Sequence, residues 1–244
     1  RDDELIVGSA TIAPRGCQVF PEYSYEWLLS ELDTVSTRQA DPFYISEKTK
    51  AELREIFPWW KGKTTSDLAK ANMAPEAYEA FTEHAIFTPG NYFYNGIGHV
   101  CVDYAKVMKI GYRGIIAEAE GALAKLSVSD GDYVSRSNFL YAVIESCQAV
   151  IDYAHRYSAL AKEMASKETN PERKQELEKI SRTCERVPEF GATTFYEACQ
   201  TFWFIQLILQ IESSGHSISP GRFDVYMYPY FKSDIDAGKI TYER

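Results

Sequence analysis

The chain has 244 residues, enough for one large domain with a substantial core, and its 45% hydrophobic and 25% charged residues are typical of a folded protein rather than a disordered one. Its 26 basic and 35 acidic residues give a net charge of −9 without any basic stripe, so the composition argues against nucleic acid and an anionic membrane surface as partners. The sequence shows no signal-peptide pattern, and its longest apolar stretch, around residues 202–209, is too short to span a bilayer.

The N-terminal segment predicts little regular structure. Turn-forming glycines and prolines favour extended or loop structure over residues 1–25. A short helix is predicted over Tyr25–Leu32, with one face formed by Trp27, Leu28 and Leu32.

Two helices with recognisable start signals follow. Ser46–Phe57 is predicted to be amphipathic, with Ser46 as N-cap, Pro58 as its end, and an apolar face of Leu53, Ile56 and Phe57. A further short helix is predicted over Thr64–Asn72.

The stretch Thr88–Asp103 has a different composition. Four of its residues are Gly or Pro, placed among Tyr92, Phe93, Tyr94 and His99. Glycine loses more conformational freedom on folding than other residues, so this density indicates unusual backbone angles or close approach in an interior. The segment Tyr104–Leu126 is then predicted to be helical, with interruptions at Gly111 and Gly114.

The second half predicts three long helices and little strand. Asn138–Ser166 shows helical periodicity, and Asn170 and Pro171 start a second helix that Pro188 ends. Thr194 and Glu197 predict a capping box at the start of Phe195–Ile211. Twelve of the seventeen residues in that helix are apolar, on all sides, so it is expected to be central to its fold. If this chain is too small to surround the helix, part of its face around Phe202, Phe204 and Ile208 is expected to be open to solvent or to another copy. The fold class predicted for the chain as it stands is therefore mainly α-helical.

The five cysteines are odd in number, widely spaced and without a CxxC pair. This argues against zinc and disulfide frameworks and favours a reducing cytoplasm. Cys147, Cys184 and Cys199 lie in helical patterns and are predicted to be buried.

Four groups of short motifs together resemble the glycyl radical enzymes, the superfamily of pyruvate formate-lyase, and most closely their diol, glycerol and hydroxyproline dehydratase branch. They match in order and spacing over nearly the whole chain, and they lie at 4–8 with 20–22, at 95–104, at 153–161, and at 187–188, 197–200, 212–217 and 221–224. Val225 departs from the pattern, because a glutamine commonly follows the Gly-Arg-Phe-Asp run.

The resemblance implies a ten-stranded α/β barrel of the pyruvate formate-lyase type, of which residues 1–244 would be a partial domain from the N-terminal to middle portion. The family's thiyl-forming cysteine and radical-bearing glycine belong to later segments, and neither motif occurs here. We therefore expect no catalytic residue, metal or bound cofactor in this portion, which alone should be inactive. The family's radical is installed by a radical-SAM activating enzyme, and the full-length protein is expected to form a homodimer.

The same resemblance implies substrate-binding roles for His99 and Ser217, which should face one concavity. A group that shares a proton with a departing hydroxyl would assist a dehydration, as a histidine can. The alternatives are a core histidine and a loop hydrogen bond, and three other serines compete for the role of Ser217, namely Ser213, Ser214 and Ser219.

Other candidates carry weaker signals. Cys101 lies two residues from His99 but lacks a nucleophile elbow or an orienting acid. A structural role is predicted for His216 and for an Arg222–Asp224 ion pair. His84 and His155 lie on helical patterns and are not expected to be catalytic.

The leading hypothesis is a portion of an anaerobic lyase that eliminates water, or a similar leaving group, from a small hydroxylated substrate by thiyl-radical hydrogen abstraction. Formate acetyltransferase and arylacetate decarboxylase activity are alternatives within the superfamily. A non-catalytic helical interaction domain is the alternative outside it.

Overall fold

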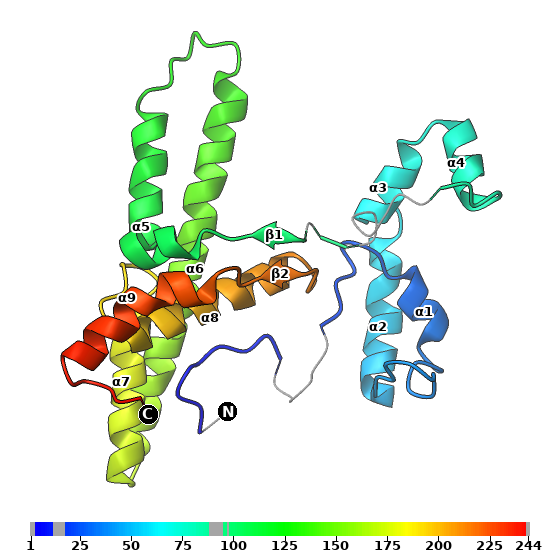
Figure 1. The fold of residues 1–244 in the computed structure, drawn as a ribbon. Helices are drawn as coiled ribbons and strands as arrows, with labels where there is room; N and C mark the ends of the chain where they lie inside the picture. Colours follow the sequence, from blue (N-terminus) through cyan, green and yellow to red (C-terminus); the bar gives the residue numbers. More distant parts are fainter. Residues whose placement is uncertain (1–2, 12–17, 88–94, 97, 243–244) are drawn as a thin grey trace. The chain divides into compact units, whose positions relative to one another are not determined.

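The computed structural model describes residues 3–11, 18–87, 95–96 and 98–242. Two compact units make up the chain: a first unit of residues 1–10, 101–209 and 218–244, and a second unit of residues 11–100 and 210–217. The described residues are mainly helical (Figure 1), which confirms the predicted class. The only strands among them are β1 (Val100–Cys101) and β2 (Ile218–Ser219), which pair with each other.

Four short helices form the second unit: α1 (Glu26–Glu31), α2 (Glu47–Trp60), α3 (Thr65–Ala71) and α4 (Pro75–Thr82). Their core consists of the buried side chains Tyr25, Leu28, Leu32 and Phe57, with Ile45, Leu53 and Trp60 packed against them. Thr64 and Asp67 form a reciprocal capping box that begins α3, and Ser46 caps α2 by accepting from the amide of Thr49.

Three predictions in this unit are wrong in detail, namely the core-facing positions of Trp27 and Ile56 and the helix end at Pro58. The side chain of Trp27 is 53% exposed and that of Ile56 is also exposed, because each lies about 100° around its helix from a neighbour that takes the core position, Leu28 or Phe57. Pro58 does not end α2, which continues to Trp60, where the indole packs against the core cluster. Helix α4 was not predicted, although Pro75 at its first turn is a recognised start signal.

The long helices form the first unit: α5 (Tyr104–Leu123), α6 (Tyr133–Lys167), α7 (Pro171–Arg186), α8 (Phe195–Glu212, whose last turn belongs to the second unit) and α9 (Phe223–Asp236). Asn170 caps α7 as predicted, accepting from the amides of Glu172 and Arg173. Helix α6 begins at Tyr133, five residues before the predicted start at Asn138. The first turn was missed because its apolar residue Val134 is exposed and does not continue the apolar face of the helix.

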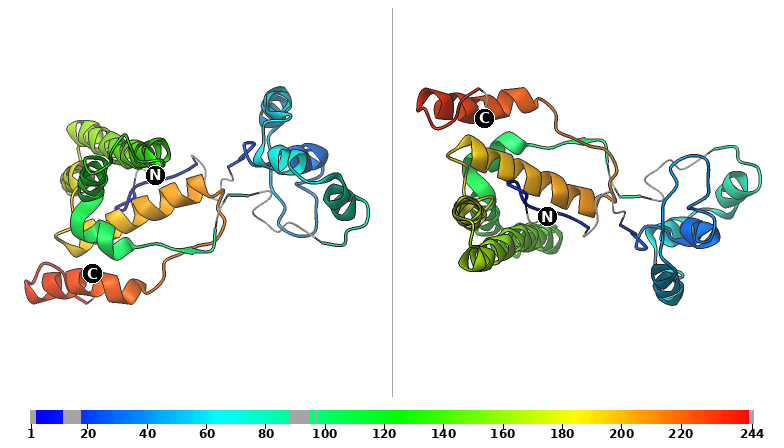
Figure 2. Two further views of the ribbon diagram at one scale, coloured as in Figure 1. Left: turned by 90° about the horizontal axis from the view of Figure 1, so that it is seen from above. Right: turned by 90° about the horizontal axis from the view of Figure 1, so that it is seen from below.

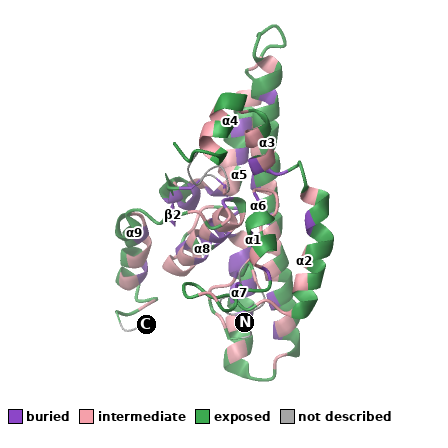
Figure 3. Ribbon diagram, turned by 90° about the vertical axis from the view of Figure 1, so that its right-hand side faces the viewer, coloured by how far each residue is buried: buried purple, intermediate pink, exposed green. Residues whose placement is uncertain are grey.

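Helix α8 is the central element of the first unit (Figure 2). Phe204 packs with buried residues of α6 and α7, whereas Ala198 and Ile205 pack with α5 and α9. Figure 3 shows buried positions along α8 and mostly exposed or intermediate ones on α9. Thr194 caps α8 through the amide of Glu197, but the Glu197 carboxylate accepts from Thr193, not Thr194, so the predicted capping box is incomplete.

A backbone kink confirms one of the two predicted interruptions of α5. Gly111 adopts φ 65° and ψ 175°, whereas Gly114 continues the helix. The amides of Tyr112 and Arg113, which leave the helical pattern here, donate to the carbonyls of Pro188 and Glu189 at 2.9 and 3.0 Å. A Cβ atom on Gly111 would lie 2.2 Å from the Glu189 carbonyl oxygen, so only glycine fits.

Candidate functional site

His99 and Ser217 lie side by side in the second unit. The amide of His99 donates a hydrogen bond to the carbonyl oxygen of Ser217 at 2.9 Å, although the two residues are 217 − 99 = 118 positions apart. Both side chains are exposed. Both residues also have positive φ angles, 54° and 55°, which are uncommon outside glycine and asparagine and often mark functional segments. The structure therefore brings together the two residues that the sequence singled out.

Two glycines allow this close approach. A Cβ atom on Gly98 would lie 1.7 Å from the His216 carbonyl oxygen, and one on Gly96 would lie 2.8 Å from the Ser213 Cα. Both distances are far below van der Waals contact, so the 95–99 segment packs directly on the backbone of the 212–217 turn. The glycine density that the sequence displayed is explained by this packing, at least for these two positions; Thr88–Tyr94 and Ile97 lie outside the described residues.

His216 contributes a second imidazole to the same place. Its ring meets the His99 ring edge to face, with centroids 5.0 Å apart, and its Nδ1 lies 3.0 Å from the Gly96 carbonyl oxygen. The sequence predicted a structural role for His216, and the contact with Gly96 is compatible with that prediction. The ring nevertheless lies next to His99, so two imidazoles line this part of the unit.

The turn after α8 carries these groups in a costly backbone conformation. Ser214, Gly215 and Ser217 all have positive φ angles, of 53°, 77° and 55°. The turn is held by hydrogen bonds from Gly215 to the Gln210 carbonyl at 2.8 Å and from His216 to the Ser213 carbonyl at 3.1 Å. Such conformations persist when surrounding contacts determine them, which is common at ligand sites.

The competing serines occupy different environments. The Ser214 hydroxyl oxygen accepts from the amide of Gly96 at 3.3 Å, which assigns it to holding the two segments together. Ser213 is only 4% exposed, and its hydroxyl has no hydrogen-bond partner among the described residues. Ser219 is exposed on β2.

Tyr23 belongs to the site and was missed by the sequence analysis. Its hydroxyl donates to the carbonyl oxygen of Glu212, the last residue of α8, at 2.5 Å. Nothing in the sequence distinguishes this residue from the other sixteen tyrosines, because the contact joins positions 189 residues apart.

The site offers hydrogen-bonding groups rather than a complete catalytic centre. Imidazole nitrogens and serine hydroxyls both donate and accept, which suits the hydroxyl groups of a small ligand. Within the described ranges, no three His, Cys, Asp or Glu side chains are grouped closely enough to hold a metal ion.

The remaining candidates lie elsewhere or have structural contacts. Cys101 is exposed, and Cys147 and Cys184 are buried as predicted, with the pKa of the Cys184 thiol raised by burial to about 12. Cys199 is only half-buried, unlike the prediction, because it packs against the edge of a core cluster and is not one of its buried members. Burial raises the pKa of its thiol to about 11. Cys17 lies outside the described residues.

Two side-chain predictions concern charged contacts. Arg222 and Asp224 form the predicted ion pair at 2.8 Å, which lowers the pKa of the Asp224 carboxyl mainly through the side-chain hydrogen bond. His155 lies on α6 as predicted, 2.8 Å from the buried Glu189 carboxylate, whereas His84 lies just beyond the end of α4.

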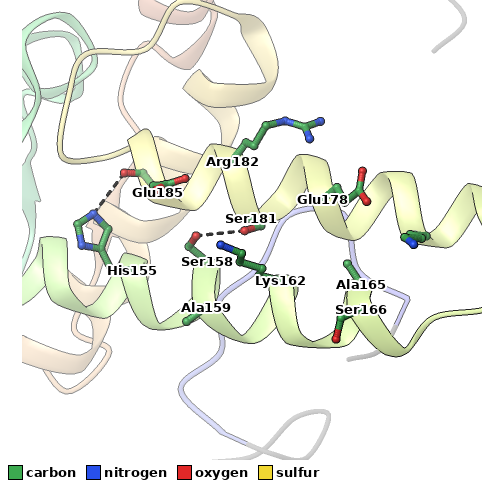
Figure 4. Close-up of a pocket in the computed structure, with 11 residues that line it drawn as sticks. His155, Ser158, Ala159, Lys162, Ala165, Ser166, Glu178, Ser181, Arg182 and Glu185 are labelled. Carbon is green, nitrogen blue, oxygen red and sulfur yellow. Dashed lines mark hydrogen bonds between the residues drawn. The ribbon is translucent and has the colours of Figure 1, made fainter.

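A surface groove between α6 and α7 is a separate feature (Figure 4). Charges of both signs line it, with Lys162 and Arg182 beside Glu178 and Glu185. The hydrogen bond between Ser158 and Ser181 at 3.2 Å crosses from one helix to the other. This hydrogen bond joins the two helices. His99 and Ser217 are not among the residues that line the groove.

A family model described as pyruvate formate lyase-like matches residues 1–244. The chain belongs to this family, and the resemblance to the glycyl radical enzymes and their dehydratase branch is thereby confirmed. A solved structure from work on 1,2-propanediol dehydration in Roseburia inulinivorans is 58% identical, with a TM-score of 0.93 over 100% of this chain and 29% of that chain.

Two further relatives agree with this assignment. The glycerol-bound B12-independent glycerol dehydratase from Clostridium butyricum is 52% identical, with a TM-score of 0.89 over 95% of this chain and 29% of that chain. The (2S)-3-sulfopropanediol dehydratase of Klebsiella oxytoca is 37% identical over 99% of this chain and 30% of its own length. The chain thus spans about 30% of the length of the relatives it matches.

Within the described residues, no helix is long and apolar enough to cross a membrane.

Proposed function

We propose that this chain is a portion of a glycyl radical dehydratase and that His99 and Ser217 bind the hydroxyl groups of a small polyol. The observation that carries the proposal is the hydrogen bond from the His99 amide to the Ser217 carbonyl oxygen, which joins the two motif residues. Both residues also have positive φ angles. The similarity to enzymes whose names refer to propanediol and glycerol supports the choice of substrate class.

The proposed chemistry assigns the side chains of this chain a binding and proton-sharing role. The family's radical supplies hydrogen abstraction from a substrate carbon, and the cysteine and glycine that carry it are proposed to lie in segments other than this one. Loss of the neighbouring hydroxyl as water needs a proton, which a histidine in contact with that hydroxyl can share. A serine hydroxyl that shares a hydrogen bond with the second substrate hydroxyl orients the carbon from which hydrogen is abstracted.

The larger assembly is part of the same proposal. The helices described above would form an outer layer and an early wall of a ten-stranded barrel of the pyruvate formate-lyase type. A radical-SAM activating enzyme would install the radical, and the complete protein would form a homodimer in the cytoplasm. The long, mostly apolar α8 and the coverage of about 30% of each relative support a larger structure around this portion.

The test uses the full-length protein that contains this chain, activated anaerobically, with aldehyde formation from glycerol and 1,2-propanediol as the readout. We expect His99→Asn to lower kcat by roughly 10²-fold, a typical contribution of a positioned proton donor. Asparagine tolerates positive φ, so the backbone at position 99 is preserved. Ser217→Ala should raise KM by about three- to tenfold, the value of one hydrogen bond.

Matched controls separate the site from general damage. His84→Asn and Ser129→Ala alter the same residue types at exposed positions and should leave turnover unchanged. Glycyl radical content, measured by electron paramagnetic resonance, should be equal in all variants. Diol turnover that survives both site substitutions would place the substrate elsewhere, and formate or carbon dioxide production instead of dehydration would replace the proposed activity by one of the alternatives in the superfamily.

A further inference from the structure

The Tyr23 hydroxyl touches both segments of the candidate site. It donates to the Glu212 carbonyl oxygen at 2.5 Å, and a Cβ atom on Gly96 would lie only 2.7 Å from the same hydroxyl. Tyr23 therefore contacts the 95–99 segment and the start of the 212–217 turn, which themselves meet at His99 and Ser217. All of these residues belong to the second unit.

Tyr23 is itself fixed by the beginning of helix α3. The Tyr23 carbonyl oxygen accepts from the amide of Ser66 at 3.1 Å and from the hydroxyl of Thr65 at 3.2 Å. The amide of Thr65 donates to the carbonyl oxygen of Glu22 at 2.9 Å. These amides belong to the first turn of a helix, where backbone donors lack partners within the helix. The tyrosine is thus attached to a capped helix rather than to a free loop.

The phenol stays a hydrogen-bond donor at neutral pH. Burial raises its pKa above the ordinary value of 10.0, and the neighbouring carboxylates of Glu22 and Glu212 raise it further. A protonated hydroxyl donates to the Glu212 carbonyl, one of the carbonyls at the end of α8 that lack a partner within the helix.

The turn that follows Glu212 needs an external restraint. Ser214 and Ser217 adopt positive φ angles that are costly for residues with a Cβ atom, and such conformations persist only where surrounding contacts determine them. The hydrogen bond from Tyr23 acts on the residue immediately before this turn, so it fixes the direction in which the chain leaves α8.

We propose that Tyr23 is a positioning residue, whose hydroxyl holds the Glu212 carbonyl and so fixes the turn that carries His216 and Ser217 beside His99. The restraint of the turn by Tyr23 follows from the hydrogen bond to Glu212. The effect of that restraint on catalysis rests on the proposed function. Tyr23 does not contact the substrate in this proposal; it acts through the turn.

Tyr23→Phe removes only the hydroxyl, and Tyr25→Phe is its matched control. Tyr25 is two residues away in the same unit, is 5% exposed, and packs its ring on Phe57 with centroids 5.0 Å apart. In the unactivated full-length protein, hydrogen exchange of the Gly215 and His216 amides should be about fivefold faster in Tyr23→Phe, the value of one hydrogen bond, and unchanged in Tyr25→Phe.

The catalytic effect is measured in the activated full-length protein. Tyr23→Phe should raise KM for glycerol or 1,2-propanediol about fivefold, with kcat changed less than KM and with equal radical content. Unchanged exchange at residues 215–216 overturns the proposal, as does an equal loss of melting temperature and equal kinetics in both variants, which would indicate a general packing effect. Faster exchange in a protein whose wild type does not dehydrate diols would retain the positioning role and reject the proposed function.

Discussion

Single atoms decide whether the candidate site can form. Gly96 and Gly98 occupy positions where a methyl group has no room, and in both cases the obstacle includes the backbone of the 212–217 turn. Backbone atoms cannot move aside as a flexible side chain can. The two glycines are therefore required by the packing of the segments.

Gly98→Ala should separate the two segments. Its Cβ atom would lie 1.7 Å from the His216 carbonyl oxygen, so the backbone has to shift, at a cost of about 1–3 kcal/mol of unfolding free energy. We expect a lower melting temperature and weaker diol binding in the full-length protein, measured by calorimetry.

Gly121→Ala is the matched control. This exposed position on α5 has open space around a Cβ atom, so alanine should be neutral or stabilising by up to about 1 kcal/mol. If Gly98→Ala behaves like the control, the close packing of residues 95–99 on the turn is wrong.

At the scale of elements, side chains rather than a sheet hold the irregular segment 4–9 of the first unit. The buried Gln200 amide on α8 accepts from the Val7 amide at 2.9 Å and donates to the Val7 carbonyl at 2.7 Å. Trp203 Nε1 donates to the Gly8 carbonyl at 2.8 Å, and the Tyr196 hydroxyl donates to the Leu5 carbonyl. Helix α8 thus supplies polar partners to an irregular segment while its apolar side chains fill two core clusters.

Gln200→Leu tests this arrangement. Leucine has a similar volume but leaves the Val7 N–H and C=O groups without their partners, which should cost about 2–4 kcal/mol for two hydrogen bonds in a buried setting. Urea denaturation of the full-length protein measures the change. Gln175→Leu, on the exposed face of α7, should change stability by less than about 0.5 kcal/mol. Equal effects of the two substitutions would show that segment 4–9 is not held through Gln200.

At the scale of the whole molecule, the central helix is better covered than its composition suggested. The sequence led us to expect an open apolar face around Phe202, Phe204 and Ile208. Phe204 is instead 0% exposed, because α6 and α7 surround it, and Phe202 and Ile208 are half-buried. Large apolar side chains are nevertheless exposed, including Trp203 on α8 itself and Tyr228 on α9.

The isolated 244-residue chain should therefore be inactive and prone to self-association. We expect no dehydratase, decarboxylase or formate-lyase activity even with an activating enzyme, because the motifs for the thiyl and glycyl radicals do not occur in this sequence. Exposed apolar surface on several helices favours association, so light scattering at equal concentration should show larger particles for the isolated chain than for the full-length protein. Turnover by the isolated chain, or a monomer with a sharp melting transition, would contradict this prediction.

The sequence by itself determined the helical class, the caps at Ser46 and Asn170, and the family. These features depend on neighbours within four residues or on motif order along the chain. Through the family resemblance, the sequence also predicted that His99 and Ser217 lie close together and bind the substrate. Their substrate-binding role stays a prediction.

Only the tertiary structure decided which residues meet across long separations. Periodicity could not choose between adjacent apolar residues such as Trp27 and Leu28, because the choice depends on which neighbour the helix packs against. Nor could it reveal the bond from Tyr23 to Glu212, since a hydrogen bond between positions 189 residues apart leaves no local pattern in the chain. The physical reason is the same in both cases: burial and long-range hydrogen bonds are properties of the assembled fold, whereas helix formation and capping are local.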